Sequence, residues 1–146
     1  MKEVSIHGYR EDLKQYFRSK MEANICRYYN FTDVKYLYES AEFEFKEIKR
    51  GTKYYKPDFY LPDKDKWVEV KGFFRKTDIT KLKRFKKYYP EEFAKLQFIV
   101  PDKYAGTKAN GKMIAFLLDI LNIKFEEIIS YKELAKIGRA FILNWE

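Results

Sequence analysis

The spacing of apolar side chains predicts a helix near the start of the chain, over residues 10–29. Apolar residues recur there at every third or fourth position, as they do on one face of an amphipathic helix. These residues are Leu13, Phe17, Met21, Ile25 and Tyr28. Arg18 and Glu22 lie four residues apart on the flank of this stripe, a spacing that would allow them to form an ion pair.

Three strands are predicted next, because apolar and aromatic residues either alternate with polar ones or gather in short runs. They lie within residues 41–49, 54–61 and 66–74. Gly51 and Thr52 give a turn signal between the first two strands. Pro57 removes one N–H from the second strand, which places that residue near a sheet edge or a bulge.

The period changes to that of a helix from Thr77, and Pro90 would end this helix. Thr77 or Asp78 can cap its first turn. A continuously apolar segment at residues 95–101 then predicts a strand that is covered on both faces. Residues 111–122 predict an apolar helix that is packed on nearly all sides.

The last part of the chain is ambiguous, with a short helix expected around residues 131–137 and an extended segment over residues 140–145. The whole order of elements is α-β-β-β-α-β-α. This order predicts an α/β fold in which a mixed central sheet is flanked by helices on both sides. Because no repeat, linker or low-complexity segment interrupts the pattern, residues 1–146 are expected to form a single domain.

The basic charge of the chain is concentrated in one segment. The 146 residues include 30 Lys and Arg against 22 Asp and Glu, which gives a net charge of +8. Residues 71–90 contain eight basic residues and one acidic residue, and so carry a net charge of +7. A local excess of this kind is typical of a nucleic-acid interface, although a basic helix face is often only solvated.

The composition excludes several other classes of protein. Cys26 is the one cysteine and His7 the one histidine, which leaves no internal disulfide, no cysteine-based zinc site and no histidine-based triad. No apolar stretch is long enough to span a membrane, and the first residues lack the apolar core of a signal peptide. We therefore expect a cytoplasmic protein with no membrane partner.

Charged residues occur in the middle of the second and third strands, where a half-buried hairpin would normally carry none. If residues 62–65 form a four-residue turn, Asp58 falls opposite Glu69. Because strand residues alternate faces, Lys71 shares a side with Glu69. Two facing carboxylates repel unless a cation lies between them, and Mg²⁺ prefers carboxylate oxygens, water and phosphate. This arrangement predicts metal-assisted hydrolysis of a phosphodiester, with Lys71 holding or activating a water.

A simpler interpretation treats these charges as surface residues. Asp58 would then belong to a turn or bulge, and Glu69 and Lys71 to the solvent face of a one-sided sheet. We favour the metal site because the three charges fall in register while Val68 and Val70 occupy the opposite face.

The order of these motifs resembles that of a known nuclease family. The tripeptide "PDF", followed ten residues later by "EVK", resembles the PD-(D/E)XK signature of restriction-endonuclease-like nucleases, and the α-β-β-β-α-β order is similar to their core. Over residues 18–101 the chain is similar to the phage endonuclease I family, which resolves four-way Holliday junctions. The shared motifs are "RSKME", "YKPDFYLPD" and "WVEVKGFF", followed by the basic helix.

The resemblance implies roles for particular residues. The implied catalytic residues are Glu22, Asp58, Glu69 and Lys71, and the implied metal ligands are Glu22, Asp58, Glu69 and the carbonyl of Val70. The cofactor would be Mg²⁺, with Mn²⁺ as a substitute. The substrate would be branched DNA, and the enzyme would be a homodimer with one active site for each of two strands. Exchange of a segment between the subunits is left open, because Gly51 would equally close a hairpin within one subunit.

Several residues are candidates for DNA contact: Arg18, Ser19, Arg75, Lys76, Lys81, Lys83 and Arg84. Arg18 and Ser19 can donate hydrogen bonds to phosphate oxygens, and the basic helix can follow a DNA arm. Arg18 would alternatively form only the pair with Glu22 on the helix surface.

The sequence therefore predicts a Mg²⁺-dependent endonuclease that resolves four-way junctions, in the host cytoplasm if it is phage-encoded. Two alternatives stay open. One is a nuclease of the same type with another target, such as a nickase or a mismatch, transposition or restriction endonuclease. The other is a non-catalytic DNA-binding protein of the same fold, which should have lost at least one acid or the lysine, and none is missing.

Overall fold

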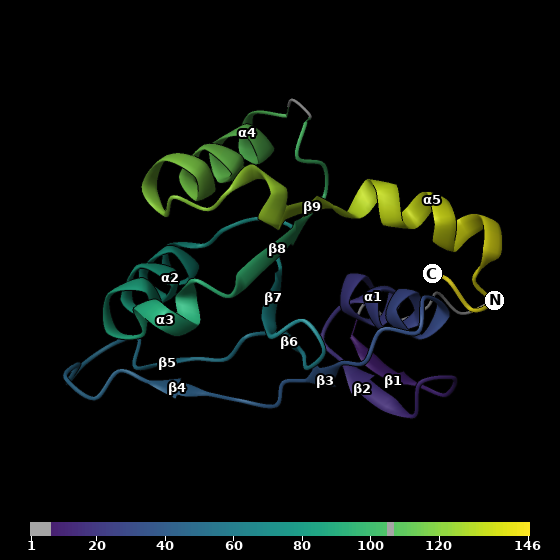
Figure 1. The fold of residues 1–146 in the computed structure, drawn as a ribbon, viewed down its shortest axis with the longest axis horizontal. Helices are drawn as coiled ribbons and strands as arrows, with labels where there is room; N and C mark the ends of the chain where they lie inside the picture. The colour runs from purple at the N-terminus through teal and green to yellow at the C-terminus, as the bar shows by residue number, and fades with distance from the viewer. Residues whose placement is uncertain (1–6, 105–106) are drawn as a thin grey trace.

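A mixed five-stranded sheet with helices on both faces forms the centre of the molecule (Figure 1). This computed structural model describes residues 7–104 and 107–146. It confirms the predicted α/β class and the mixed character of the sheet. Within the part of the chain that is described, no helix is long and apolar enough to cross a membrane.

The strands of the described residues are β1 (Gly8–Arg10), β2 (Gln15–Phe17), β3 (Leu37–Tyr38), β4 (Phe43–Glu44), β5 (Tyr54–Tyr55), β6 (Phe59–Leu61), β7 (Lys66–Val70), β8 (Leu96–Val100) and β9 (Ile128–Ser130). The central sheet has the order β3-β6-β7-β8-β9. β3, β6 and β7 are antiparallel neighbours, whereas β7, β8 and β9 run parallel to one another. β1 pairs with β2 and β4 pairs with β5 in two small separate sheets.

The α-helices of the described residues are α1 (Lys20–Phe31), α2 (Lys76–Tyr88), α3 (Pro90–Phe93), α4 (Lys108–Ala115) and α5 (Tyr131–Phe141). α4 continues into a π-helical turn, η1 (Phe116–Ile120), and a 3₁₀ turn, η2 (Phe125–Glu127), precedes β9. Ser19 caps α1 by accepting the N–H of Glu22 at 3.1 Å. A local hydrogen bond thus fixes the start of α1.

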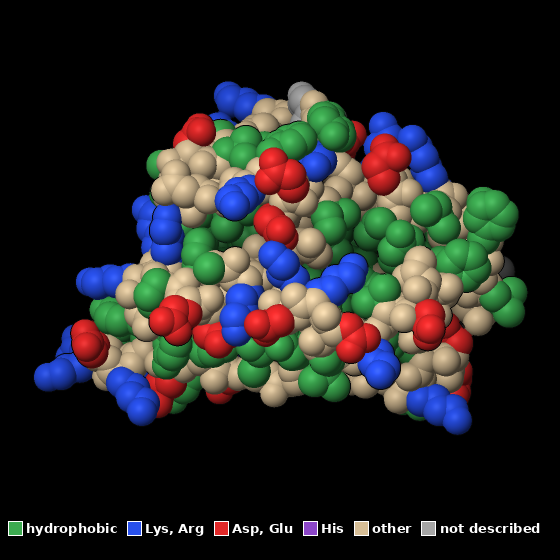
Figure 2. Space-filling model, in the orientation of Figure 1, with side chains coloured by type: hydrophobic (Ala, Val, Ile, Leu, Met, Phe, Trp, Pro, Cys, Tyr) green, Lys and Arg blue, Asp and Glu red, His purple; other side chains and the backbone are tan. Residues whose placement is uncertain are grey.

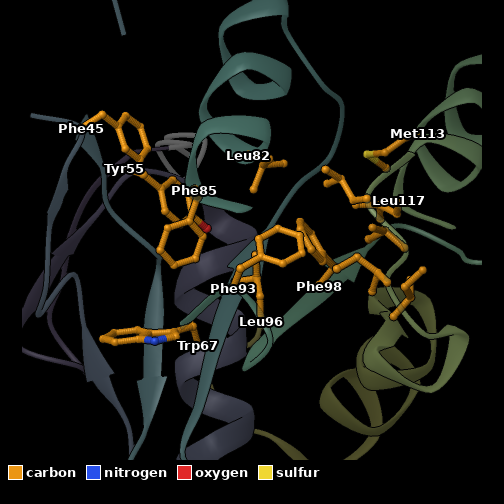
Figure 3. Close-up of a cluster of buried hydrophobic side chains, with 14 residues drawn as sticks. Phe45, Tyr55, Trp67, Leu82, Phe85, Phe93, Leu96, Phe98, Met113 and Leu117 are labelled. Carbon is orange, nitrogen blue, oxygen red and sulfur yellow. The ribbon is translucent and has the colours of Figure 1, made fainter. Parts of the chain in front are cut away.

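Each face of the central sheet has its own hydrophobic core. α2, α3, α4 and the β4-β5 pair cover one face, where Phe85 and Phe98 are fully buried (Figure 3). α1, α5 and the β1-β2 hairpin cover the other face, where Ile25 is fully buried. The alternation along β7 follows this division, because Trp67 belongs to the first core and Val68 to the second.

The predicted helix over residues 10–29 is wrong in its first half. Residues 8–17 form the β1-β2 hairpin, and α1 begins only at Lys20. The turn of the hairpin holds Lys14 at a φ of 50°, a left-handed conformation that an α-helix does not contain. Phe17 is still buried on the face covered by α1, so two different elements together produce the apolar spacing that predicted one helix.

The strands in the middle of the chain are shorter than predicted. The second predicted strand, residues 54–61, is divided into β5 and β6 by a break that contains Pro57, which has no N–H for a ladder. β4 pairs only with β5, and the connection between them contains Gly51 at a φ of 80°. The two-residue strand β3, which was not predicted, lies beside β6.

The helix α2 and the strand β8 agree with the prediction. α2 ends at Tyr88, ahead of Pro90, and β8 is flanked by parallel neighbours on both sides. Asp78 caps α2 as one of the two predicted candidates, because its Oδ2 accepts the N–H of Arg75 at 2.8 Å. This carboxylate stands in the first turn, where the helix dipole favours a negative charge.

The structure of the C-terminal third differs more from the sequence prediction. The helix predicted over residues 111–122 is buried along one face only, and Ile120 on its other side is 54% exposed. β9 was not predicted, since three residues give no visible period. α5 continues to Phe141, so the extended segment predicted over residues 140–145 is helical at its start.

Two buried arginines hold the carboxylate of Glu146 against the N-terminal hairpin and α1. The carboxylate accepts hydrogen bonds from Arg10 Nε at 2.8 Å and from Arg27 Nη1 at 2.9 Å. Arg27 also donates to both oxygens of Asp12, at 2.8 and 3.0 Å. Burial alone would raise the pKa of Glu146, but the hydrogen bonds from Arg10 and Arg27 outweigh it and hold the pKa below its usual value.

Glu146→Gln is expected to lower the free energy of unfolding at pH 7 by about 3 kcal/mol, because it removes one charge from a buried ionic network. A carboxyl whose pKa is depressed in the fold stabilises the protein above its unfolded pKa and loses this contribution as pH falls through the folded pKa. The difference between the variant and the wild type should therefore shrink below about pH 4. Urea denaturation at pH 7 and pH 3 measures it.

Glu133→Gln is the matched control, since Glu133 is well exposed and pairs only with Lys136 on the surface of α5. Its unfolding free energy should change by less than about 0.5 kcal/mol. Equal changes in unfolding free energy for the two substitutions would contradict the expected contribution of the buried ionic network to stability.

Candidate active site

The β6-β7 hairpin places Asp58 beside Glu69. The antiparallel register runs from the four-residue turn to Phe59 opposite Val68. Asp58 directly precedes β6, so it occupies the next position of this register, opposite Glu69, as the sequence predicts. Its Oδ2 accepts the backbone N–H of Val70 at 2.7 Å, which fixes the side chain against the end of β7.

Glu69 and Lys71 lie on the same side of the sheet, as predicted. The side chain of Glu69 is buried, and its Oε1 accepts a hydrogen bond from the hydroxyl of Tyr55 at 2.8 Å. The Nζ of Lys71 lies 3.3 Å from Glu69 Oε2 and 2.9 Å from Asp78 Oδ1. Because Glu69 is 4% exposed, the simpler interpretation of a solvent-facing charge stripe is wrong for this residue.

Glu22 approaches the same group from the first turn of α1. It is buried, and its Oε1 accepts a hydrogen bond from the hydroxyl of Tyr38 at 3.0 Å. Glu22 also contributes, mainly through its charge, to raising the pKa of Asp58. α1, β3 and the β6-β7 hairpin therefore bring three acidic side chains together.

Burial and the repulsion between neighbouring carboxylates disfavour the charged forms of Asp58 and Glu69. The pKa of Asp58 lies well above its usual value because of burial first, then the charges of Glu69 and Glu22. Burial also raises the pKa of Glu69, although Lys71 and Tyr55 offset part of this effect. In the absence of a cation, Asp58 and Glu69 therefore keep a proton more readily than exposed acids do.

Lys71 is held in its charged form. Burial alone would lower its pKa, but the carboxylates of Glu69 and Asp78 outweigh burial and raise it. An ammonium group donates three hydrogen bonds and accepts none. In this arrangement Lys71 can orient an anion or a water, or give up a proton, and it does not serve as a ready base.

A pocket of about 220 Å³ opens over these side chains. Its walls are formed by Arg18, Glu39, Glu42, Tyr54, Tyr55, Lys56, Asp58, Glu69, Lys71, Asp78, Lys81 and Leu82. Glu22 is not among the lining residues. Acidic and basic side chains gather across the middle of one face of the molecule, below α4 (Figure 2). A mixed charged lining suits a small polar or phosphate-bearing ligand better than an apolar one.

The donor set fits a hard divalent cation. Among the described residues, no three His, Cys, Asp or Glu side chains converge as a set of metal ligands. Asp58 and Glu69 each direct one oxygen to a protein donor. However, the crowded negative charge on Asp58 and Glu69 would be relieved by a cation. Carboxylate oxygens are the ligands that Mg²⁺ and Mn²⁺ take in proteins.

The predicted DNA contacts at the start of α1 have different neighbours from those expected. Arg18 does not pair with Glu22, because its Nε lies 2.9 Å from Glu39 Oε2, with 69% of its side chain exposed at the rim of the pocket. The hydroxyl of Ser19 accepts the N–H of Glu22. The structure thus gives Ser19 a capping role and leaves Arg18 accessible to a ligand.

The residues in and just ahead of α2 that were predicted to contact DNA have different surroundings. Lys81 lines the pocket. Lys76 and Lys83, seven residues apart on one exposed face of the helix, lie outside the pocket. Arg84 donates to the carbonyl of Thr52 and so holds the β4-β5 connection. Arg75, just ahead of the helix, is exposed, with its guanidinium 5.6 Å from the ring centroid of Phe73.

The structure adds residues that the sequence did not identify. Tyr55 and Tyr38 each donate to one of the acids, and Asp78 contacts Lys71. Lys56, next to the "PDF" motif, lines the pocket. Asp78 was recognisable only as a helix cap, and nothing in the spacing of the tyrosines distinguishes them from the many core aromatics of this chain.

A scan against protein-family models, a search of curated proteins and a search of solved structures found no match to this chain. The arrangement of charged side chains in the pocket is therefore what supports a functional assignment.

Asp58→Asn is expected to raise the free energy of unfolding at pH 7 by about 1 kcal/mol in metal-free buffer, a size common for stabilising changes at strained sites. The amide still accepts the Val70 N–H but carries no charge to repel Glu69 and Glu22. A carboxyl group whose pKa is raised in the folded state lowers the stability of the protein as pH rises from its pKa in the unfolded state to its pKa in the folded state. The gain should therefore shrink toward pH 4, and urea denaturation with EDTA at both pH values measures this.

Asp63→Asn, in the exposed turn of the same hairpin, provides the control and should change stability by less than about 0.5 kcal/mol. A loss of stability at pH 7 in Asp58→Asn would show that the carboxylate is favourably placed in the free protein.

Proposed function

We propose that this protein is a Mg²⁺-dependent endonuclease of the PD-(D/E)XK type that resolves four-way DNA junctions. The observation that carries this proposal is the meeting of Asp58, Glu69 and Lys71 in one pocket, from the two motifs that resemble the nuclease signature. Buried acids with raised pKa values beside a charged lysine are typical of catalytic rather than structural positions.

The finer fold assignment belongs to the same proposal. We take α1, β3, the β6-β7 hairpin, α2 and β8 as the restriction-endonuclease-like core, with Glu22 contributed by α1. The parallel pairing of β7 with β8, and the position of α2 between them in the chain, support this assignment. β9 and α5 would then be additions to this core.

The residues that would hold the metal are Asp58 and Glu69, with the carbonyl of Val70 as a further ligand and Glu22, from the first turn of α1, as the additional acid. A divalent cation bound there would offset the negative charge of the phosphate in the transition state and lower the pKa of a nearby water. Mn²⁺ would substitute, because it prefers similar oxygen ligands.

The chain's own side chains would orient the attacking water and the DNA backbone. Lys71, as a fixed ammonium, would donate hydrogen bonds to the attacking water or to a non-bridging phosphate oxygen. In-line attack on phosphorus would break the bond to the 3′ oxygen and leave 5′-phosphate and 3′-hydroxyl ends. Arg18, Lys56 and Lys81 on the pocket walls would hold the neighbouring backbone.

A homodimer would supply one such pocket for each of two strands. β4 and β5 pair within one chain, so a dimer would not need an exchanged segment. Phe141 and Leu143 at the end of α5 are 71% and 85% exposed, and Phe31 is also exposed. These apolar side chains offer a surface for the second copy.

With Mg²⁺ the wild-type protein is expected to cut a four-way junction and to leave a linear duplex of the same arms nearly intact, because the bent junction is recognised by its shape. Glu69→Gln should reduce the cleavage rate by about 10³-fold or more, as losses of an essential catalytic group do. It should still bind the junction when Ca²⁺ replaces Mg²⁺. Gel assays of labelled junction and duplex measure both properties.

Glu126→Gln, an exposed acid on η2 away from the pocket, is the control and should cut at the wild-type rate. Equal cutting of junction and duplex would favour a nuclease with another target. Full activity in Glu69→Gln would exclude this pocket as the active site, and binding without any cleavage by the wild type would favour the non-catalytic alternative.

Metal binding should also be visible without DNA. Mn²⁺ at about 100 times its dissociation constant would stabilise the wild type by about 2.7 kcal/mol, because the ligand binds only the folded state. The melting temperature should rise accordingly, by several degrees. Asp58→Asn and Glu69→Gln should show much smaller shifts, whereas Glu126→Gln should match the wild type. Equal shifts in all four proteins would place the metal elsewhere.

A further inference from the structure

Lys71 is held between two carboxylates rather than by one. Its Nζ lies 3.3 Å from Glu69 Oε2 and 2.9 Å from Asp78 Oδ1. Glu69 belongs to the sequence motif. Asp78 lies seven residues after Lys71, on a different element, the first turn of α2. The shorter of the two contacts is thus made by a residue outside the motif.

Asp78 is itself fixed by a second bond. One carboxylate oxygen receives Lys71, and the other accepts the backbone N–H of Arg75 at 2.8 Å. The side chain is 13% exposed and lines the pocket. Because each oxygen has its own partner, the carboxylate cannot rotate without breaking a bond, and its position is tied to the start of α2.

Lysine needs such a partner if it is to act in catalysis. Its four-carbon stem carries about 2 kcal/mol of rotamer entropy, and its ammonium has no preferred direction of its own. Glu69 alone would hold it poorly, since under the proposed function the carboxylate of Glu69 also faces a cation. Asp78 is fixed by the backbone N–H of Arg75 at the start of α2, so its hold on Lys71 does not depend on that cation.

We propose that Asp78 is a positioning residue that holds the ammonium of Lys71 in its working place. This inference rests on the proposed nuclease function, and it assigns Asp78 no contact with the reacting atoms. It also connects the pocket to α2, the helix that carries Lys81 on the pocket wall and Lys76 and Lys83 on its exposed face. DNA held along α2 would thereby be kept in a constant position relative to Lys71.

Asp78→Asn tests this assignment with little change in shape. The amide oxygen can still accept the Arg75 N–H, but the charge that faces Lys71 is lost. The maximal cleavage rate of the junction is expected to fall about 10-fold or more, since small displacements of a catalytic group have effects of this size. The half-saturating protein concentration, and junction binding in Ca²⁺, should stay within about 2-fold of the wild type.

Asp78→Glu is the conservative variant. Glutamate at this position of a helix keeps both the charge and the bond to the N-cap N–H, so it should recover most of the rate lost in Asp78→Asn. Thr107→Ala is the structural control, because Thr107 also satisfies a backbone N–H at the start of a helix, accepting that of Asn110 in α4 at 3.1 Å, and does not line this pocket. It should lose stability but keep the wild-type rate.

The outcomes separate the two proposals. If the wild type cuts the junction and Asp78→Asn cuts it equally fast, the positioning role is wrong and the proposed function stands. A rate loss in Thr107→Ala as large as in Asp78→Asn, or an equal loss of junction binding, would also overturn the positioning role. If the wild type cuts no DNA with Mg²⁺ or Mn²⁺, the proposed function fails, and the role of Asp78 in it fails as well.

Discussion

The burial of two carboxylates next to each other, with a single ammonium group beside them, is the constraint on which the rest of this structure depends. Burial and mutual repulsion raise the pKa of both Asp58 and Glu69. A fold accepts such a cost only where the surrounding bonds fix the groups in place. Here the Val70 N–H, the Tyr55 hydroxyl and Lys71 do so. The elements around the pocket are best understood as the support for this group.

The part of the site that lies on one hairpin was predictable from the sequence. A four-residue turn and the alternation of a strand are local rules, and together they place Asp58 opposite Glu69 and turn Lys71 to the same side. The α/β class and β8 were predictable for the same reason, because a continuous apolar segment flanked by helical periods has few other solutions. The local pattern of apolar and polar residues predicts an element well where that element depends mainly on contacts with a single neighbouring element.

What the sequence did not provide depends on contacts between distant residues. The N-terminal hairpin that stands in place of the expected helix is tied by Arg10 to Glu146, 136 residues away, an ionic contact that no window of the sequence contains. β9 is a strand only because β8 lies beside it. In the site, Tyr55 is 14 residues from Glu69, and Asp78 had the spacing of an ordinary cap. Its second bond, to Lys71, exists only once α2 is docked on the sheet.

The most direct test of the account is the chemistry of the cut itself. The wild-type protein is incubated with a four-way junction and Mg²⁺, and the products are treated with a DNA ligase after the protein is removed. Ligase reseals only ends that carry 5′-phosphate and 3′-hydroxyl groups. We predict paired cuts that require the metal and can be resealed. No cutting with either Mg²⁺ or Mn²⁺, or cuts whose ends cannot be resealed, would contradict the hydrolytic role given to Asp58, Glu69 and Lys71.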